Sequence, residues 1–516
     1  MGLDYAKTIE KWDVLEVTVS GPKEGNPFCD QWIKGTFCCQ NEKKTVDGFY
    51  DGDGVYKVRF MPSFVDEYTF EIEASFDVKA GEEDNAGNAA AGSFTVTSPS
   101  ADNHGPVRVA GTYYLAYEDG TPYHCIGTTC YVWNLQNEKL QEQTLKTLEE
   151  NAFNKIRFCI FPKHYDYNLH EPITYPYEGT PCDTSELNEN NFAEYNGCAP
   201  GNDWDFTRFN PAHFQHIEEC IKKLMALGIQ ADLIVMHPYD RWGFSMMKAE
   251  DDDRYWKYVL ARFSAYRNVW WSLANEYDLM HEKTLADWER YAAIICEKDP
   301  YHHLRSIHNC KAYYDYNLPW VTHCSIQRTE TYRSSELVNE WREKYHKPVV
   351  LDEICYEGYI QFGWGNISGE EMTRRFWEAF CRGGYPGHGE TYLSPDRILW
   401  WSHGGVLHGT SPERIKFLAK IMEETPGLGV EPMPCKWDEV ACRAAGFPAR
   451  KDYFIYYYTF MRPSFRDFYF DDTTEYQVEI IDTWEMTITD GGIHKGQFRV
   501  QLPGKEYIAV RIKAVK

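Results

Sequence analysis

Residues 269–278 read VWWSLANEYD. The first six, VWWSLA (269–274), are uncharged and mostly apolar, and Asn275, Glu276 and Asp278 follow them. A continuous apolar run of this length is typical of a strand buried on both faces of a parallel sheet. The polar residues that follow it mark the carboxyl end of the strand. This stretch therefore favours an α/β fold with its ionisable groups placed where strands end.

Comparable runs recur on both sides of this stretch, between residues 109 and 428. In order they are HCIGTTCY (124–131), KIRFCIF (155–161), ADLIVM (231–236), VWWSLA (269–274), LRSIH (304–308), THCSIQ (322–327), PVVLDE (348–353) and ILWWS (398–402). Amphipathic segments of helical length separate them, and this alternation over about 320 residues predicts a (β/α)8 TIM barrel. A doubly wound open sheet is the alternative, but no glycine-rich phosphate turn follows the first run.

Both flanks of this segment have strand patterning instead. Residues 1–108 contain alternating runs such as VLEVTVS (14–20), YKVRFMP (56–62) and YTFEIEAS (68–75), and these predict an immunoglobulin-like β-sandwich. Residues 429–516 contain YFIYYYTF (453–460) and YIAVRIKAV (507–515), and predict a small C-terminal β-sandwich. We expect the cluster DGDG at 51–54 to be a turn rather than an ion site.

The charge of the chain argues against some partners. The net charge is −25 and the pI about 5.1, so phosphate backbones and anionic lipids repel the protein. We therefore expect no nucleic-acid and no membrane partner. The first residues, MGLDYAKTIEKWDV, lack a signal-peptide pattern, and the 16 cysteines include no C-x-x-C pair. These observations predict a cytoplasmic protein with free thiols.

Two carboxylates have the placement that glycoside cleavage requires. Glu276 and Glu353 each follow an apolar strand directly, and strands four and seven face each other across an eight-stranded barrel. Cleavage needs one acid to protonate the leaving oxygen and one carboxylate to attack the anomeric carbon or activate water. A charged Glu353 would also raise the pKa of Glu276 and keep it protonated.

At these residues the sequence resembles the clan A retaining glycoside hydrolases. The matching segments are WWSLANEYD (270–278) and PVVLDEICYEG (348–358). The resemblance implies that Glu276 is the acid/base and Glu353 the nucleophile. It further implies that Asn275 contacts a sugar 2-hydroxyl, that Arg157 supports the nucleophile, and that Trp401 is the tryptophan after strand eight.

Across the whole chain the sequence resembles the bacterial apiosidase-like barrel proteins. The segments that carry this resemblance are GFYDGDGVYKVRFMP (48–62), DGTPYHCIGTT (119–129) and IIDTWEMTI (480–488). One feature departs from the clan A pattern, in which a tyrosine on strand six lies beside the nucleophile. Strand six here reads THCSIQRTE, so His323 or Gln327 is expected to take that role.

Further polar residues follow the predicted strands. We expect His237 and Asp240, after strand three, to bind sugar hydroxyls, although His237 is equally compatible with a satisfied rim histidine. His403 follows the predicted eighth strand. Glu390 shares the loop GYPGHGETYL (384–393) with His388. For Glu390 the alternatives are a sugar contact, a structural role and a catalytic role.

Cofactor chemistry has no motif in this sequence. There is no His-x-His after strand one, no His-Glu-x-x-His and no nucleophile elbow. We therefore expect neither a cofactor nor a catalytic metal.

Three hypotheses follow from these patterns. The first is a retaining glycoside hydrolase that cleaves small oligosaccharides or plant glycosides. The second is a non-catalytic carbohydrate-binding protein on the same scaffold. The third adds a homo-oligomer in which a neighbouring subunit shapes the cleft.

Overall fold

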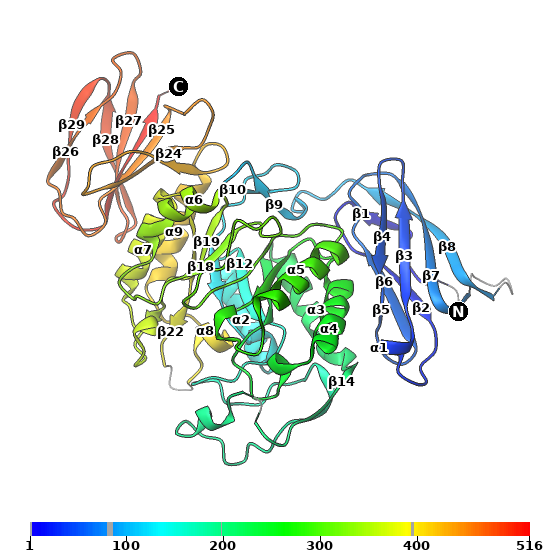
Figure 1. Ribbon diagram of the computed structural model, residues 1–516. Coiled ribbons are helices and arrows are strands. Elements are labelled where there is room, and N and C mark those ends of the chain that lie inside the picture. The colour runs from blue at the N-terminus through cyan, green and yellow to red at the C-terminus, as the bar shows by residue number, and fades with distance from the viewer. Residues whose placement is uncertain (1–2, 80–85, 198, 394–396, 516) are drawn as a thin grey trace.

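The computed structural model describes residues 3–79, 86–197, 199–393 and 397–515. At its centre lies a barrel of parallel strands and helices, with a strand-rich region on either side (Figure 1). No helix in the described ranges is long and apolar enough to cross a membrane. The predicted TIM barrel with strand-rich flanks is confirmed.

Eight parallel strands form the central sheet, in the order β17-β16-β15-β12-β11-β21-β19-β18. Their bounds are β11 Gly127–Thr129, β12 Lys155–Cys159, β15 Gln230–Met236, β16 Val269–Ala274, β17 Arg305–Ser306, β18 Cys324–Gln327, β19 Val349–Glu353 and β21 Tyr385–His388. A parallel bridge between His308 and Ser325 joins the two outer strands. This bridge closes the ring.

The eighth strand is not where the sequence pattern predicted it. The run ILWWS (398–402) leads into a short helix, α8 (Trp400–His403), whereas β21 has the sequence YPGH. Proline and glycine are poor strand formers, so pattern analysis passed over this segment. Glycine is required at 387, because a Cβ there would lie 2.7 Å from the carbonyl oxygen of Asp352 on the neighbouring strand.

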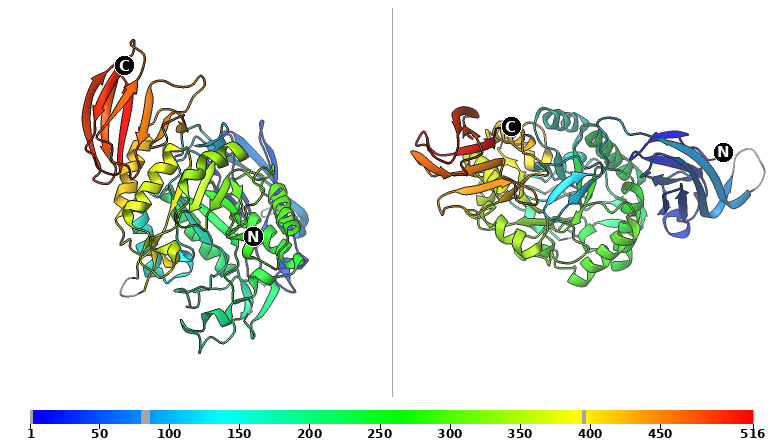
Figure 2. Two further views of the ribbon diagram at one scale, coloured as in Figure 1. Left: turned by 60° about the vertical axis from the view of Figure 1, so that its left-hand side comes forward. Right: turned by 90° about the horizontal axis from the view of Figure 1, so that it is seen from above.

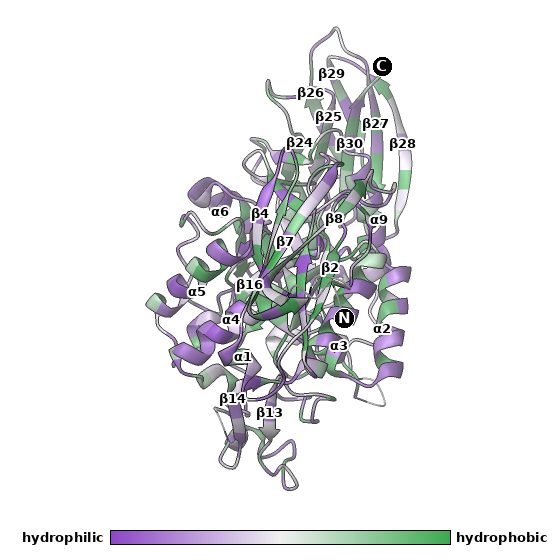
Figure 3. Cartoon of the chain, turned by 90° about the vertical axis from the view of Figure 1, so that its right-hand side faces the viewer, coloured by the Kyte–Doolittle hydropathy of each residue, from purple (hydrophilic) through white to green (hydrophobic). Residues whose placement is uncertain are grey.

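Helices surround the barrel, as the view from above shows (Figure 2). They are α2 Glu138–Glu150, α3 Pro211–Ala226, α4 Ala249–Phe263, α5 Leu285–Lys298, α6 Val338–Tyr345, α7 Gly369–Cys381 and α9 Ser411–Glu423. Each buries one face: in α3, Phe214, Ile217, Ile221 and Leu224 recur at helical spacing and are fully buried. Colouring by hydropathy shows polar and apolar segments alternating along these helices (Figure 3).

The N-terminal region consists of two antiparallel-rich sheets around one core. One contains β1 Thr8–Glu10, β8 Ala86–Thr97, β7 Glu67–Lys79, β3 Ile33–Cys38 and β4 Lys43–Asp47, and the other β2 Leu15–Ser20, β6 Val55–Phe60 and β5 Phe49–Tyr50. Phe37 of the first sheet stacks on Phe60 of the second, with ring centroids 4.3 Å apart. The DGDG segment is a turn, with Gly52, Asp53 and Gly54 at positive φ.

A buried ion cluster fixes this region to the barrel helices. Arg59 of β6 donates from both terminal nitrogens to Glu218 of α3, at 2.5 and 2.9 Å. Arg262 of α4 also donates to Glu218, at 2.7 Å, and pairs with Asp51 at 2.7 Å. Burial opposes ionisation of Glu218, but the two arginines lower its pKa to about 2. The cluster lies on the outer side of the helices and not on the barrel rim.

The C-terminal region is also built of strands. The six-stranded sheet contains β23 Val430–Pro432, β24 Val440–Ala444, β25 Tyr453–Tyr457, β30 Ile508–Ala514, β27 Tyr476–Asp482 and β28 Thr487–His494. A second sheet pairs β26 Phe465–Tyr469 with β29 Gln497–Gln501. Tyr457 packs against Trp377 of α7, with ring centroids 5.7 Å apart, which ties this region to the helix that follows strand seven.

Short two-stranded pairs and a short helix lie outside these sheets. β9 Val107–Ala110 and β10 Tyr114–Tyr117 precede the barrel, and β13 Tyr177–Thr180 pairs with β14 Asp203–Phe209 after strand two. β20 Glu357–Gly358 pairs with β22 Glu390–Thr391 beyond the ends of strands seven and eight. A short helix, α1 Pro27–Asp30, follows β2.

Candidate active site

A pocket of about 170 Å3 opens where the barrel strands end. Both predicted carboxylates line it, Glu276 directly after β16 and Glu353 as the last residue of β19. The remaining lining residues are mostly aromatic or polar: Tyr131, Lys163, Tyr165, Tyr239, Cys310, Gln327, Arg328, Thr329, Cys355, Tyr356, Trp364 and Trp401. The pocket therefore combines flat apolar walls with two acids.

Cationic and hydroxyl donors converge on Glu353. Its Oε1 accepts a hydrogen bond from Arg157 at 3.3 Å and another from the hydroxyl of Tyr131. His308 Nε2 lies 3.5 Å from the same oxygen. Burial alone would raise the pKa of Glu353, but the contacts with His308, Arg157 and Tyr131 lower it to about 2. Glu353 is therefore a carboxylate at neutral pH.

The orientation of the His308 ring follows from its neighbours. The Ser325 hydroxyl donates to Asp352, so its contact with His308 Nδ1, at 3.1 Å, is one in which the imidazole N–H donates. The other ring nitrogen faces the Glu353 carboxylate.

Glu276 has a different environment. Tyr239 donates to its Oε2, Gln327 donates to its Oε1 at 2.6 Å, and Asn275 donates to Oε2 at 3.2 Å. No lysine or arginine in the described ranges forms an ion pair with it. Burial raises the pKa of Glu276, and the nearby charge of Glu353 raises it further. The two carboxyl pKa values are thus displaced in opposite directions.

Tyr131 connects the two acids. It follows β11, and its hydroxyl both donates to Glu353 and lies 3.3 Å from Oδ1 of Asn275. Burial and the charge of Glu353 keep the pKa of Tyr131 well above its usual range, so it remains a phenol. The chain of contacts Glu353–Tyr131–Asn275–Glu276 holds the two carboxyl groups in one mouth of the barrel.

A buried lysine lies among the aromatic walls. Lys163 Nζ is 3.4 Å from the ring centre of Tyr131, 4.3 Å from that of Tyr239 and 4.7 Å from that of Trp401. Burial lowers its pKa to about 8. Cation–π contacts partly replace the lost water, so the pocket contains a positive charge that is available to a ligand.

Comparisons with known proteins give the family. Residues 110–426 match the family described as apiosidase-like, catalytic domain. The chain belongs to the apiosidase-like family. Residues 8–75 and 437–513 of this apiosidase-like chain match two further families, each described as a domain of unknown function (DUF5060 and DUF5605).

Solved structures of glycoside hydrolases are similar to this chain. The crystal structure of a candidate glycoside hydrolase from Bacteroides vulgatus ATCC 8482 is 38% identical, covers 99% of this chain and 100% of its own, and has a TM-score of 0.89. A glycoside hydrolase family 5 structure from the same organism is 16% identical over 80% of this chain and 93% of its own, with a TM-score of 0.59, and shares the fold. No curated protein matches the sequence. The apiosidase-like chain is a glycoside hydrolase.

Two of the predicted sugar contacts of this apiosidase-like protein lie outside the pocket. His237 is buried, lies 3.3 Å from the carbonyl oxygen of Phe161, and has its pKa lowered to about 3 by burial. Asp240 accepts backbone N–H bonds from Trp242, Gly243 and Ser245. Asp240 therefore shapes the turn after strand three, and its carboxylate oxygens are not presented to a ligand.

Three more predicted residues also lie away from the pocket. His323 precedes the first residue of β18, at the opposite end of the strand, and stacks edge-on against Trp270. His403 ends α8 and contacts Asn168 Oδ1 at 3.0 Å. Glu390 accepts hydrogen bonds from the backbone of residues 408 and 409. Trp401, by contrast, lines the pocket and lies edge-on to Tyr131.

Several pocket residues were not assigned roles from the sequence. Tyr131 and Tyr239, which line the pocket, and His308, which lies beside Glu353, each stand at or just after the end of a barrel strand, as Glu276 and Glu353 do. The rule that rim residues follow strand ends would have included all three. The tyrosine beside Glu353 comes from strand one instead of strand six, and Gln327 of strand six contacts Glu276.

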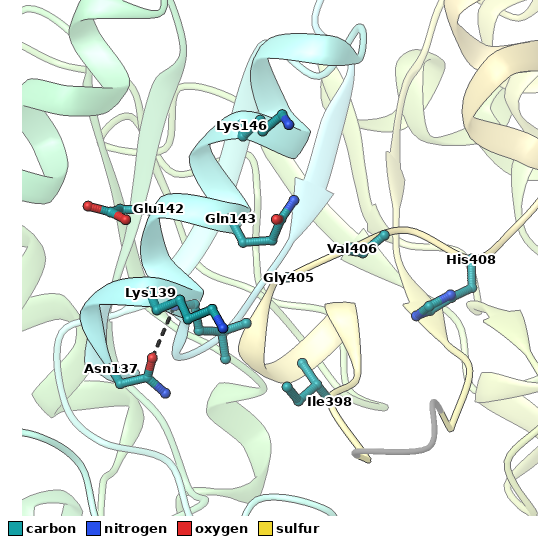
Figure 4. Close-up of a pocket in the computed structure, with 10 residues that line it drawn as sticks. Asn137, Lys139, Glu142, Gln143, Lys146, Ile398, Gly405, Val406 and His408 are labelled. Carbon is teal, nitrogen blue, oxygen red and sulfur yellow. Dashed lines mark hydrogen bonds between the residues drawn. The ribbon is translucent and has the colours of Figure 1, made fainter.

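A larger hollow of about 690 Å3 lies outside the barrel mouth. Figure 4 shows it between α2, with Lys139, Glu142 and Gln143, and the segment that includes Gly405 and His408. Neither Glu276 nor Glu353 lines it. The smaller pocket contains the acids and is the candidate active site.

Proposed function

We propose that this glycoside hydrolase works with retention of configuration, with Glu353 as nucleophile and Glu276 as acid/base. The observation that carries the proposal is the opposite displacement of two carboxyl pKa values within one pocket, lowered to about 2 at Glu353 and raised at Glu276. A pair of carboxyl groups whose environments separate their pKa values is the arrangement that assigns acid and base roles.

In the proposed first step Glu353 attacks the anomeric carbon. The bond to the leaving oxygen breaks as Glu276 transfers its proton to that oxygen, and a covalent glycosyl-enzyme forms. Arg157, His308 and Tyr131 hold Glu353 ionised and oriented, so its attacking oxygen needs no proton transfer beforehand.

In the second step Glu276, now a carboxylate, takes a proton from water. The water oxygen attacks the anomeric carbon as it loses this proton. The bond between that carbon and Glu353 breaks, and Glu353 leaves as a carboxylate. Tyr239 and Gln327 donate to Glu276 and stabilise its charge during this step. Both residues end the cycle in their starting protonation states.

The pocket favours a short substrate. Its volume of about 170 Å3 is below the range of roughly 300–1,000 Å3 found for drug-sized ligands. Rings such as Trp401 and Tyr165 line it, and flat apolar faces suit the faces of a pyranose or furanose ring. We propose that it takes one terminal sugar of a small oligosaccharide or plant glycoside, and the family description makes an apioside one member of the set to test.

Location and domain limits are further proposals. Buried cysteines of the barrel, such as Cys125, Cys159 and Cys324, are free thiols, which supports action in a reducing compartment such as the cytoplasm. We propose an immunoglobulin-like N-terminal domain ending near residue 108 and a barrel ending near residue 428, since the change from strand to alternating patterning falls there.

A screen of nitrophenyl glycosides, with an apioside included, tests the activity. On an active substrate, the anomeric configuration of the first product is followed by proton NMR, and retention is expected. Glu353→Gln should lose at least about a thousandfold in kcat, since it removes the bond-forming group. Glu340→Gln, exposed on α6, is the matched control. An inverted first product, or a near wild-type rate in Glu353→Gln, contradicts the proposal.

A further inference from the structure

Away from the pocket, three buried side chains suited to metal binding converge. Glu357 of β20, His388 of β21 and Glu390 of β22 have ligand atoms within 4.8 Å of one another. Their exposed fractions are 0%, 0% and 1%. Carboxylates and histidines are seldom so completely buried without a charged partner, so this group calls for a physical explanation.

The two carboxylates are held by one backbone segment. Glu357 accepts from the N–H groups of Thr410 and Ser411, at 2.7 and 3.0 Å. Glu390 accepts from those of His408 and Gly409, at 2.6 and 2.8 Å. A Cβ at Gly409 would lie 2.5 Å from Glu357 Oε2 and 2.6 Å from Glu390 Oε2. Glycine therefore allows both carboxylates to approach one point.

Neither carboxylate has a cationic side chain as partner. Among the residues that the structure describes, no lysine or arginine forms an ion pair with Glu357 or Glu390. The negative charge of an ionised pair would therefore be met by backbone N–H and hydroxyl dipoles, and not by a lysine or arginine of those ranges.

His388, the third member of the group, is held through one ring nitrogen. Its Nδ1 lies 3.2 Å from Thr128 Oγ1, while its buried Nε2 has no hydrogen-bond partner in the described part of the chain. Trp400 Nε1 donates to Thr128 at 2.9 Å and fixes the hydroxyl. A histidine with one ring nitrogen held by a neighbouring group and the other without a partner has that second nitrogen available to a metal ion.

We propose that Glu357, His388 and Glu390 bind one divalent transition-metal ion, of the type of Zn2+ or Mn2+, in a structural site. Mixed imidazole and carboxylate ligands suit these ions, whereas Ca2+ and Mg2+ prefer oxygen ligands alone. Ligand atoms at about 2.0–2.2 Å from an ion lie roughly 3–4 Å apart. Closing the group from its present spacing takes movements of less than about 1 Å, within the reach of glutamate side chains.

The ion would stabilise a seam of the barrel. His388 would attach the ion to strand eight. The two glutamates would attach it to residues 408–411, whose backbone N–H groups they accept from and where α9 begins. The Thr128–Trp400 contact extends this support to α8, which carries Trp401 into the pocket. His408 lines the hollow of Figure 4 and donates its backbone N–H to Glu390, so the proposed site lies next to this hollow. No part of this site takes part in the proposed chemistry of Glu276 and Glu353.

Metal content of the full chain tests the proposal. Protein purified without an affinity histidine tag is treated with EDTA, equilibrated with ZnCl2 or MnCl2, passed over a desalting column and measured by mass spectrometry of its metals. We expect one ion per chain. We also expect the Tm to rise by about 3 °C or more at saturating ion, to fall again with EDTA and to respond little to MgCl2. A folded wild-type chain that retains no ion from either salt and shows no Tm response overturns the proposal.

Isosteric variants locate the ion. Glu390→Gln and His388→Gln should weaken binding at least about tenfold to a hundredfold, while Glu413→Gln, exposed on α9, should bind as the wild type does. Equal binding by Glu390→Gln and Glu413→Gln would place the ion elsewhere and contradict the site. If the ligand variants do not fold, the wild-type stoichiometry and its EDTA-sensitive Tm decide the question.

Discussion

Gln327 lies beside Glu353 in the β18–β19 ladder and donates a 2.6 Å hydrogen bond from its side-chain amide to Oε1 of Glu276. One side chain therefore links the strand of the proposed nucleophile to the proposed acid. Because the amide stabilises the charged form of Glu276, it limits how far burial raises the pKa of that group.

Gln327→Leu should move the alkaline limb of kcat/KM to higher pH and lower the maximal rate about tenfold. The pKa of Glu276 rises when a donor to its carboxylate is lost, and orientation of the acid is lost with it. The measurement is a pH–rate profile on an active aryl glycoside. Gln477→Leu, in the C-terminal sheet, is the control; a profile in Gln327→Leu identical to that of the control would contradict the role.

The wild-type pH profile should be bell-shaped. The first chemical step needs Glu353 ionised and Glu276 protonated. Activity is therefore lost on the acidic side only as pH approaches the Glu353 pKa of about 2, or where the protein unfolds first. It is lost on the alkaline side as Glu276 loses its proton, above the usual range for a glutamate. Glu276→Gln should abolish the alkaline limb and retain more activity on substrates with good leaving groups. An unchanged alkaline limb in that variant would assign it to another residue.

Tyr131→Phe should reduce kcat about tenfold to a hundredfold and raise the pKa of Glu353, because the phenol donates to its Oε1. The acidic limb of kcat/KM should then move upward. Tyr359→Phe, more than half exposed, serves as the control. If Tyr131→Phe lowered kcat without moving the acidic limb, the phenol would act on substrate and not on Glu353.

Lys163→Met should stabilise the protein while impairing catalysis. Burial lowers the pKa of Lys163 from 10.5 to about 8. Below pH 8 the folded state therefore carries a buried charge that water solvates better in the unfolded state. Removing it should raise the free energy of unfolding by about 1–3 kcal/mol at pH 7. In the wild type this destabilisation fades as pH rises from about 8 to 10.5, and in the variant that pH dependence should be absent. Urea unfolding near pH 8 and near pH 10.5 measures the free energy of unfolding of both proteins. If that free energy changed equally with pH in the wild type and in Lys163→Met, the account would be refuted.

Glu218→Gln should weaken the attachment of the N-terminal region. The change leaves Arg59 and Arg262 buried without their shared carboxylate, a loss of roughly 3–5 kcal/mol. The lowered Glu218 pKa, about 2 against 4.5, means that its contribution is present above pH 4.5 and is lost as pH falls towards 2. Glu219→Gln, at the exposed neighbour that pairs with Lys222, should change stability little. Similar melting temperatures for the two variants would show that the cluster is dispensable.

Much of the barrel was predictable because buried parallel strands leave continuous apolar runs, and the ends of those runs located Glu276 and Glu353. The eighth strand escaped because YPGH owes its place to a close backbone approach at Gly387 and not to apolar content. The position of a residue along a strand proved as important as the strand itself. His323 precedes β18 and lies at the wrong end, whereas His308 ends its run and faces Glu353.

No local sequence pattern predicted which residues at the barrel rim contact the pocket and which have structural roles. Asp240 and Tyr239 are adjacent in sequence, yet one caps a turn and the other contacts Glu276. Side-chain direction at a loop depends on which backbone donors lie free nearby, and tertiary packing decides that. Glu390 is a second case, since the amides that bind it come from the segment at 408–409, distant in sequence.

Glu276 adopts a left-handed backbone conformation, with φ of 50° and ψ of 56°. A residue with a Cβ is strained there, by about 1 kcal/mol or more, whereas glycine and asparagine tolerate the region. Once selection for hydrolysis relaxes in a lineage, drift at this position should favour those two residues, since each relieves strain and removes a buried acid. Gly or Asn aligned with Glu276 in a relative would therefore mark a protein that kept the barrel and gave up turnover, and such relatives should melt at higher temperature than their active cousins.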